Sequence, residues 1–443
     1  IMEDITLYTS HLNSRATIKI GGYKHVLVSL VSAAVACNCD VTFQNVPDIF
    51  DTQQIIQILR SIGKKVDYSE SSLTLHSGCI TCSDIPKQYS ETIHGSIYLF
   101  IALVVANKRG SILNSGGCAI GNEKTKSSRP EHHFYEVMEH FGIKVEVASD
   151  GRRNGSYDKL APAVIDIKDF KSNNGISSNL HSGATKAAIL CATAVTDGTV
   201  EIKHPYLKPD VTELLEFLKL YGFNIQFSHD TIRISHSKSV SGNLTFQIMP
   251  DIAEIISFIS FAVFNKVDLL LEFEQITKVQ QGLRAEFSIL SECKVPIEWT
   301  EKGLYIPGSI GIRPLPFSII VTSSSIFSDS QPFFSIMALL SSGESSIKEG
   351  IWVSRFKYAE EAQKMGYPYE IQDNTLIIRP WTERRVQEHV DLVATDLRAA
   401  FVLMTLAVRY QDITIRDFYH IHRGYENIYE KMKSLGIGFT VSN

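Results

Sequence analysis

The apolar and polar positions of the chain follow one order that returns six times. Each copy begins with an apolar helix rich in small residues, as at 184–194 and 399–408. A strand such as 199–202 follows, then a more amphipathic helix, and then a pair of short strands such as 224–227 and 231–234. Periodicities near 3.6 and 2 distinguish these helices from the strands. The pattern predicts a repeated βαβαββ unit.

The amphipathic helix of each copy ends at a recurring step, where a strand follows directly. In five copies the residue at this step is glycine, which favours a left-handed C-cap, and in the fourth copy it is lysine. The six steps are Gly63, Gly142, Gly222, Lys294, Gly366 and Gly436, at intervals of 79, 80, 72, 72 and 70 residues. Six copies of about 70 residues therefore fill the chain.

A unit of this size is too large for a thin solenoid, so we expect two groups of three units, each around a pseudo-threefold axis. The segment 235–243 is rich in Ser, His, Lys and Gly and is typical of a linker. Residues 5–20 have no copy of their own and are expected to complete the second group. The prediction is a domain of residues 21–235 and a domain of residues 1–20 plus 236–443, with two chain crossings, a cleft and a hinge.

Composition is that of a globular protein with a full core. The 443 residues, 44% hydrophobic and 21% charged, exclude a disordered, collagen-like or disulfide-stapled chain. A net charge of -5, without blocks of like charge, argues against a nucleic-acid partner. The longest apolar run, 97–106, is about half the length of a membrane span. Without a secretory signal at the start, the prediction is a soluble, cytoplasmic protein with reduced cysteines.

Four of the seven cysteines, Cys37, Cys39, Cys79 and Cys82, have a spacing that could be drawn as a zinc site. Cys37 and Cys39 close a helix rich in Ala and Val, however, where small residues simply pack, so no metal site is predicted. Cys118 differs, because it lies in the Gly-rich stretch 116–121 between a strand and a helix. Such a loop position favours a functional thiol, and a turn that holds a small residue is the open alternative.

Basic residues recur near predicted helix starts, at Lys24, Arg355, Arg398 and Arg423. Cations there oppose the helix dipole, so they do not serve helix stability. They suit a bound anion that also uses the free backbone N–H groups. For any single basic residue, the alternative is a solvated side chain without a ligand.

Three aspartates also stand at helix starts, at Asp251, Asp329 and Asp396. An aspartate in this place is ordinarily an N-cap. The recurrence indicates capping in the second group, and composition cannot select Asp329 as catalytic over the other two.

Five short motifs occur in a fixed order along the chain and carry a family resemblance. They are G-G-C-A-I-G at 116–121, S-G-A-T at 182–185, P-D-I-A-E at 250–254, A-T-D-L-R-A at 394–399 and Y-H-I-H-R-G-Y-E at 419–426. Together they resemble the enolpyruvyl transferases, most closely the branch that acts on UDP-N-acetylglucosamine. The resemblance covers nearly the whole chain. It implies an α/β fold in which six βαβαββ units form two inside-out barrel domains that close over the substrates.

The resemblance also implies a reaction. The enolpyruvyl group of phosphoenolpyruvate passes to the 3-hydroxyl of UDP-N-acetylglucosamine through a tetrahedral ketal, and phosphate leaves. Phosphoenolpyruvate is a co-substrate, and neither cofactor nor metal is implied. Cys118 matches the general acid, Asp329 the carboxylate that accepts the hydroxyl proton, and Lys24 and Arg423 match catalytic cations. The residues matching the phosphoenolpyruvate site are Lys24, His25, Arg129, Arg355, Arg398 and Arg423.

The acceptor side departs from the family more than the phosphoenolpyruvate side. Seven residues, 122–128, stand where the family usually has one. His25 replaces a usual Asn, His94 a usual Arg, and Asn179 a usual basic residue. The positions matching the acceptor site are His94, Arg129, Pro130, Glu131, His132, His133, Asn179, Leu180, His181, Ser182, Gly183, Asp329 and Ile351.

These departures leave the acceptor open. Transfer to UDP-N-acetylglucosamine in cell-wall precursor synthesis is one hypothesis, and transfer to a nucleotide such as UMP in a nucleoside-antibiotic pathway is the other. An inactive nucleotide-binding paralogue is a third, against which the retained Cys118, Lys24, Asp329 and Arg423 argue. RNA-phosphate cyclases share the βαβαββ unit but have no reason to keep these residues. The expected partners are phosphoenolpyruvate and a uridine nucleotide or nucleotide sugar, with no membrane, and the chain is expected to be a monomer or weak homo-oligomer.

Overall fold

The computed structural model describes residues 2–8, 10–113, 131–170, 182–237, 242–383 and 388–443. These residues divide into two compact units. The N-terminal unit consists of the described residues from Gly22 to Ile248. The C-terminal unit combines the residues before Gly22 with Met249–Asn443. Within the described ranges, each unit contains three four-stranded sheets.

All six sheets share one pairing pattern. The first strand pairs parallel with the second, which pairs antiparallel with the third, and the third pairs antiparallel with the fourth. A parallel pair needs a crossover connection, usually a helix, whereas the last two strands can be neighbours in sequence. The predicted βαβαββ unit is therefore confirmed.

In the N-terminal unit, the strand order of the first sheet is β14 (Leu244–Gln247), β3 (Val41–Gln44), β5 (Ser72–Leu75) and β4 (Val66–Ser69). The order of the second is β6 (Asp84–Ile85), β7 (Arg109–Ile112), β9 (Arg153–Ser156) and β8 (Lys144–Val147). The order of the third is β10 (Val164–Asp166), β11 (Thr199–Lys203), β13 (Thr231–Ser235) and β12 (Asn224–Phe227). In the C-terminal unit, the strand order of the first sheet is β2 (Arg15–Lys19), β15 (Asp268–Glu272), β17 (Gly303–Pro307) and β16 (Glu298–Thr300). The order of the second is β18 (Ser318–Val321), β19 (Ser345–Glu349), β21 (Thr375–Ile378) and β20 (Tyr369–Gln372). The order of the third is β22 (Val390–Val393), β23 (Ile413–Arg416), β1 (Asp4–Leu7) and β24 (Phe439–Ser442).

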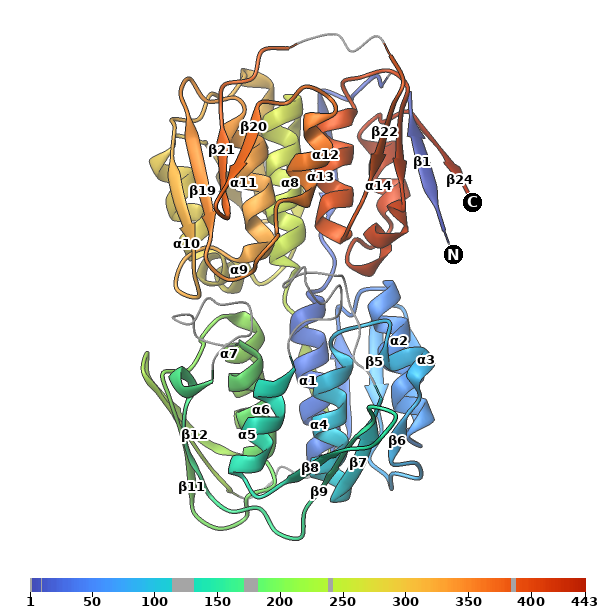
Figure 1. Cartoon of the computed structure of the whole chain (residues 1–443), viewed down its shortest axis with the longest axis vertical. Helices are drawn as coiled ribbons and strands as arrows, with labels where there is room; N and C mark the ends of the chain where they lie inside the picture. The colour runs from blue at the N-terminus through green and yellow to red at the C-terminus, as the bar shows by residue number, and fades with distance from the viewer. Residues whose placement is uncertain (1, 9, 114–130, 171–181, 238–241, 384–387) are drawn as a thin grey trace. The chain divides into compact units, whose positions relative to one another are not determined.

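Three helices in mutual contact form the centre of each unit (Figure 1). They are α1 (Lys24–Cys37), α4 (Ser96–Asn107) and α6 (Ser182–Ala192) in the N-terminal unit, and α8 (Ile252–Asn265), α11 (Gln331–Ala338) and α13 (Leu397–Ala407) in the C-terminal unit. All 14 residues of α8 and all 11 of α13 are buried. Helices that are apolar all round belong inside, so helices fill the centre and sheets lie outside, as the predicted inside-out α/β barrel requires.

The second helix of each copy is more amphipathic than the inner helix of that copy, and it is either shorter or more exposed to solvent. These helices are α2 (Phe50–Ser61), α5 (His132–His140), α7 (Pro209–Tyr221), α9 (Ile276–Gly282) with α10 (Arg284–Glu292), α12 (Lys357–Gln363) and α14 (Ile428–Ser434). A short α3 (Lys87–Ser90) and the 3₁₀ turns η1 (Ile167–Asp169), η2 (Gly308–Ile310), η3 (Ser328–Ser330) and η4 (Phe418–Arg423) complete the elements. The apolar run 97–106 lies in α4, and no described helix is both long and apolar enough to cross a membrane.

The repeated step after the second helix has the predicted left-handed backbone. The φ angles are 96° at Gly63, 95° at Gly142, 126° at Gly222, 64° at Lys294, 86° at Gly366 and 84° at Gly436. The fourth copy keeps this geometry with a lysine, at the steric cost that a side chain incurs there. Local chemistry therefore marks the same point of the unit six times.

Strands from outside a copy complete three of the six sheets. The N-terminal segment supplies two strands: β1 lies between β23 and β24, and β2 pairs with β15. Strand β14, which follows the third copy in sequence, pairs with β3 of the first. The expected boundary at 235/236 precedes β14, whereas the structure keeps this strand in the N-terminal unit and places the boundary after Ile248. The predicted boundary is therefore wrong. The first copy has no first strand of its own, and β14 takes that position in its sheet.

Candidate functional site

The three aspartates at helix starts in the C-terminal unit have different roles. Asp251 caps α8 by accepting hydrogen bonds from the N–H groups of Ala253 (2.9 Å) and Glu254 (3.1 Å). Asp396 caps α13 in the same way, through Arg398 and Ala399 (both 2.9 Å). Asp329 lies in the turn η3, one residue before Ser330, the N-cap of α11, and that cap has no side-chain hydrogen bond. The inserted 3₁₀ turn therefore removes Asp329 from the capping position.

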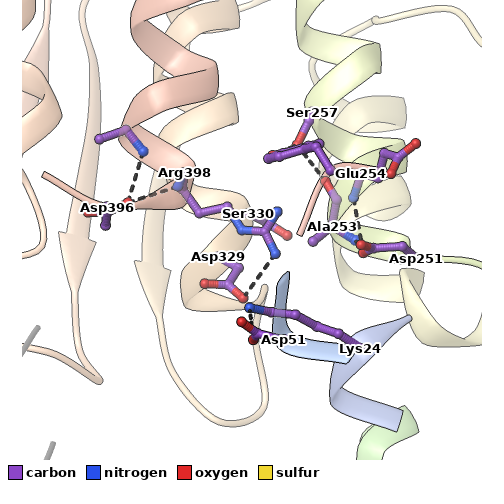
Figure 2. A network of polar contacts seen from close by, with 12 residues as sticks. Lys24, Asp51, Asp251, Ala253, Glu254, Ser257, Asp329, Ser330, Asp396 and Arg398 are labelled. Atoms are coloured by element: carbon purple, nitrogen blue, oxygen red, sulfur yellow. Dashed lines mark hydrogen bonds and ion pairs between the residues drawn. The ribbon is translucent and has the colours of Figure 1, made fainter. Parts of the chain in front are cut away.

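Two arginines, both predicted for the site, face the Asp329 carboxylate. Figure 2 shows one of them, Arg398, beside Asp329. Arg355, from the segment before α12, places Nη2 2.5 Å from Oδ1 of Asp329. Arg398, the second residue of α13, places Nη2 3.8 Å from Oδ2. The structure thus brings together Asp329 and Arg355 of the fifth copy and Arg398 of the sixth.

Arg398 is a buried cation with an unused hydrogen-bonding face. Its side chain is 2% exposed, and its three guanidinium nitrogens have no hydrogen-bond acceptor among the described residues. The guanidinium carbon lies 5.3 Å from the ring centre of Tyr425, whose hydroxyl meets Ser257 Oγ at 2.6 Å. Burial opposes the charge, but Tyr425, Asp329 and Asp251 outweigh it and raise the pKa of Arg398. A guanidinium held ionised and lacking acceptors is suited to binding an anion.

Arg423 is the last residue of η4 and is half-buried. It acts on the neighbouring His420: burial first, and then the charge of Arg423, lower the pKa of that imidazole. His420 is therefore kept neutral at physiological pH, which leaves Arg423 as the local positive charge.

Lys24 and His25 begin α1 of the N-terminal unit. The Lys24 ammonium forms an ion pair with Asp51 of α2, at 2.9 Å from Oδ2, with both side chains largely buried. The His25 ring packs edge-on against Tyr23 at 5.4 Å, and its charge helps to lower the pKa of Asp210. The first turn of α1 thus presents a cation whose position is fixed by a carboxylate.

Part of the predicted acceptor segment lies at the start of α6. Gly183 approaches α5 so closely that a Cβ there would lie 2.7 Å from the Phe134 ring and 2.9 Å from Nε2 of His133. His133 stacks on Phe134 at 4.2 Å between centroids, and the His94 ring lies 6.0 Å from Phe134. The structure therefore brings His94, His133 and Gly183 around one aromatic ring.

A buried ion pair supports this segment. Asp210 of α7 accepts a hydrogen bond from Ser182 Oγ (2.6 Å), and its Oδ2 lies 2.8 Å from the Lys186 ammonium. Lys186 also lies over the Tyr98 ring at 4.4 Å. Burial works against both charges, but Lys186 and then Ser182 lower the pKa of Asp210, while Asp210 and Tyr98 raise the pKa of Lys186. Both groups are therefore ionised across neutral pH.

The remaining predicted residues have peripheral contacts or fall outside the described ranges. Glu131 accepts a hydrogen bond from Tyr135 (2.8 Å), and His132 packs edge-on against His133 at 5.7 Å. Ile351 lies half-buried between β19 and α12. The predicted residues outside the described part of the chain are Cys118, Arg129, Pro130, Asn179, Leu180 and His181.

Sequence reasoning missed the partners that hold the predicted residues in place. Asp51 stands 27 residues from Lys24, and Asp210 stands 24 residues from Lys186. Tyr425 belongs to the motif at 419–426, in which the basic residues, not the tyrosine ring, indicate an anion site. An acidic residue in the first turn of a helix, such as Asp51 or Asp210, ordinarily serves the helix dipole, so nothing local distinguishes these two.

Known proteins match the chain in both sequence and fold. The profile of EPSP synthase (3-phosphoshikimate 1-carboxyvinyltransferase) matches residues 10–432. UDP-N-acetylglucosamine 1-carboxyvinyltransferase of Wolbachia pipientis (strain wPip) is 26% identical over the full length of both chains. The enolpyruvyl transferase NikO from Streptomyces tendae superposes with a TM-score of 0.89 at 27% identity, covering 100% of this chain and 99% of its own.

An EPSP synthase structure from Acinetobacter baumannii shares the fold alone, with a TM-score of 0.72 and 14% identity over the whole of both chains. The profile match extends over nearly all of the sequence, and its two ends fall in the C-terminal unit. The chain therefore belongs to the EPSP synthase family, and it is an enolpyruvyl (carboxyvinyl) transferase.

Proposed function

We propose that this enzyme transfers the enolpyruvyl group of phosphoenolpyruvate to the 3-hydroxyl of UDP-N-acetylglucosamine and releases phosphate. The observation that carries the proposal is the carboxylate of Asp329 facing two buried arginines, one of which, Arg398, lacks a hydrogen-bond acceptor among the described residues. A substrate with a phosphate and a carboxylate supplies the acceptors that such arginines need.

The cations have the task of binding and charge stabilisation. Arg355, Arg398 and Arg423, with Lys24, are assigned to the phosphate and carboxylate groups of phosphoenolpyruvate. Buried cations stabilise developing negative charge more strongly than cations in water. Asp51 keeps the Lys24 ammonium in position, and the Arg398 guanidinium lies over the Tyr425 ring, 5.3 Å from its centre.

The proton transfers require one acid and one base. Protonation of C3 makes C2 of the enolpyruvyl group electrophilic, and we assign that proton to the Cys118 thiol. The acceptor hydroxyl then adds to C2 as Asp329 takes its proton, which gives a tetrahedral ketal. Phosphate then leaves, and one C3 proton returns to the Cys118 thiolate, which restores the double bond, regenerates the thiol and yields the enolpyruvyl ether.

UDP-N-acetylglucosamine is the first choice of acceptor because the similar proteins of Wolbachia pipientis and Desulfosudis oleivorans carry that name, the latter at 27% identity over 95% of each chain. UMP is the second choice, because His94 at the acceptor side stands where the family usually has arginine. A loss of positive charge there favours an acceptor with fewer phosphates.

The test is release of phosphate from phosphoenolpyruvate with UDP-N-acetylglucosamine, UMP and shikimate 3-phosphate in parallel. Release with UDP-N-acetylglucosamine supports the proposal, and release with UMP alone replaces its acceptor. Absence of release with either uridine nucleotide refutes it.

The acid is tested separately by Cys118→Ser, which is expected to lose turnover and alkylation by fosfomycin. The exposed Cys79 provides the control, since Cys79→Ser should keep both. Full activity of Cys118→Ser would mean that the proton comes from another group.

A further inference from the structure

The turn that carries Asp329 lies between two buried carboxylates that do not belong to it. The first is Glu286 of α10, whose side chain is fully buried. Its Oε2 accepts a hydrogen bond from the hydroxyl of Ser330 (2.6 Å) and another from the N–H of Phe327 (3.1 Å). Glu286 therefore binds the turn on both sides of Asp329, at residues 327 and 330.

The second carboxylate is Glu349 at the end of β19, which is 1% exposed. Its Oε1 accepts hydrogen bonds from the hydroxyl of Ser328 (2.9 Å) and from the N–H of Trp352 (3.2 Å). Glu349 thus ties the turn to the segment that leads into Arg355, the partner of Asp329.

Stability alone does not explain why two carboxyl groups are buried beside this turn. Burying a carboxylate carries a desolvation penalty that hydrogen bonds only partly repay, and apolar residues of the same size often stabilise a fold as well or better. Hydrogen bonds to charged acceptors are, however, about twice as strong as neutral ones and fix geometry. Four bonds to these two buried carboxyl groups hold residues 327, 328, 330 and 352, while the Asp329 carboxylate itself pairs with Arg355 and Arg398.

We propose that Glu286 and Glu349 are positioning residues of the transfer reaction: they clamp the turn Ser328–Asp329–Ser330 so that the Asp329 carboxylate meets the acceptor hydroxyl. The inference rests on the proposed role of Asp329 as the base. Catalysis depends on such placement, because a displacement of about 1 Å can cost about 100-fold in rate. The clamp acts through Ser328 and Ser330, and neither glutamate needs to touch substrate.

The experiment removes the hydrogen bonds of the clamp and keeps both buried carboxyl groups. Ser328→Ala and Ser330→Ala each delete one hydroxyl and are expected to lower kcat about 10- to 100-fold, with the KM for phosphoenolpyruvate unchanged. Glu286→Gln keeps an acceptor oxygen and is expected to retain more activity than Ser330→Ala. The matched control is Ser335→Ala, because this buried hydroxyl of α11 bonds the carbonyl of Pro332 (2.5 Å) and meets the hydroxyl of Tyr369 (3.3 Å) rather than the two glutamates.

Two further readouts separate positioning from ordinary stability. The acid limb of the kcat–pH profile, which the base governs, should shift in Ser328→Ala and Ser330→Ala but not in Ser335→Ala. Amide hydrogen exchange of the peptide spanning 327–331 should rise in the first two variants alone. Wild-type kcat in both clamp variants, with an unchanged pH profile, overturns the proposal.

The proposed function can fail independently of the clamp. Wild-type protein that releases no phosphate with any acceptor refutes the role of Asp329 in transfer. Hydrogen exchange then still decides whether the two glutamates hold the turn, and unchanged exchange in Ser328→Ala and Ser330→Ala refutes the clamp itself.

Discussion

Replacing Lys186 with methionine is expected to destabilise the protein by removing one partner of a buried ion pair. The Lys186 ammonium lies 2.8 Å from Asp210, and the two side chains are 6% and 11% exposed. Methionine keeps most of the apolar stem, so packing changes little. The dominant effect of Lys186→Met is the uncompensated charge of Asp210.

The magnitude follows from that burial. Breaking a buried pair by removing one partner typically costs about 3–5 kcal/mol, since the other charge is left in a poorly solvating environment. Asp210 keeps the hydrogen bond from Ser182 at 2.6 Å, which places the expected loss near the lower end, at about 3 kcal/mol. With a urea dependence of about 3 kcal/mol per molar, the unfolding midpoint falls by about 1 M.

Urea unfolding followed by circular dichroism measures this loss. The control is Lys159→Met, because Lys159 pairs with Asp197 at the similar distance of 3.0 Å in the same unit, with side chains 73% and 76% exposed. Exposed pairs contribute little, so this variant should keep the wild-type midpoint. Adding Asp210→Asn to Lys186→Met should recover part of the loss, since a neutral amide is less costly to bury.

The pH dependence gives a second check. Without Lys186, burial raises the pKa of Asp210 above its unfolded value, so the folded variant takes up a proton as pH falls. Its deficit relative to wild type, whose Asp210 pKa is lowered, should therefore shrink between pH 8 and pH 5. Equal midpoints for Lys186→Met and Lys159→Met, or a deficit that grows on acidification, would refute the reasoning.

Three further results are expected. Asp329→Asn should lower kcat by about 10²- to 10⁴-fold in the phosphate-release assay, and a wild-type rate would exclude Asp329 as the base. Arg398→Lys should raise the KM for phosphoenolpyruvate at least about tenfold, because lysine lacks the planar fork that lies over Tyr425; an unchanged KM contradicts this assignment. Burial raises the pKa of Glu349 to about 7 despite Arg355 and Ser328, so wild type should lose stability as pH rises through 7. Glu349→Gln should reduce that loss, measured as the melting temperature at pH 5 and 8, and identical slopes would contradict it.

The repeat and the type of fold could be predicted from the sequence because local signals encode them. The predominantly apolar inner helices, the amphipathic second helices and the left-handed steps each depend on residues close in sequence. The exchange of strands could be predicted only in part. Residues 5–20 were expected to complete the second group, but the transfer of β14 to the first copy depends on a pairing with β3 about 200 residues away. Nothing within 244–247 indicates that partner.

The candidate site divides in the same way. Turn and capping chemistry is local, so the positions of Lys24, Arg355, Arg398 and three aspartates near helix starts follow from the sequence. The folded chain was needed to show that Asp251 and Asp396 cap helices while Asp329 faces two arginines. One extra 3₁₀ turn shifts the cap to Ser330.

The supporting residues were decided by the fold alone. Glu286 and Glu349 lie 43 and 20 residues from Asp329 in sequence, and each reads locally as an ordinary helix or strand residue. Their contacts with the turn exist because the inner helices of successive copies pack together and bring the turns at their ends within reach of neighbouring elements. Covalent neighbours set the conformation of a turn, but the charges that surround it come from segments that only packing brings together.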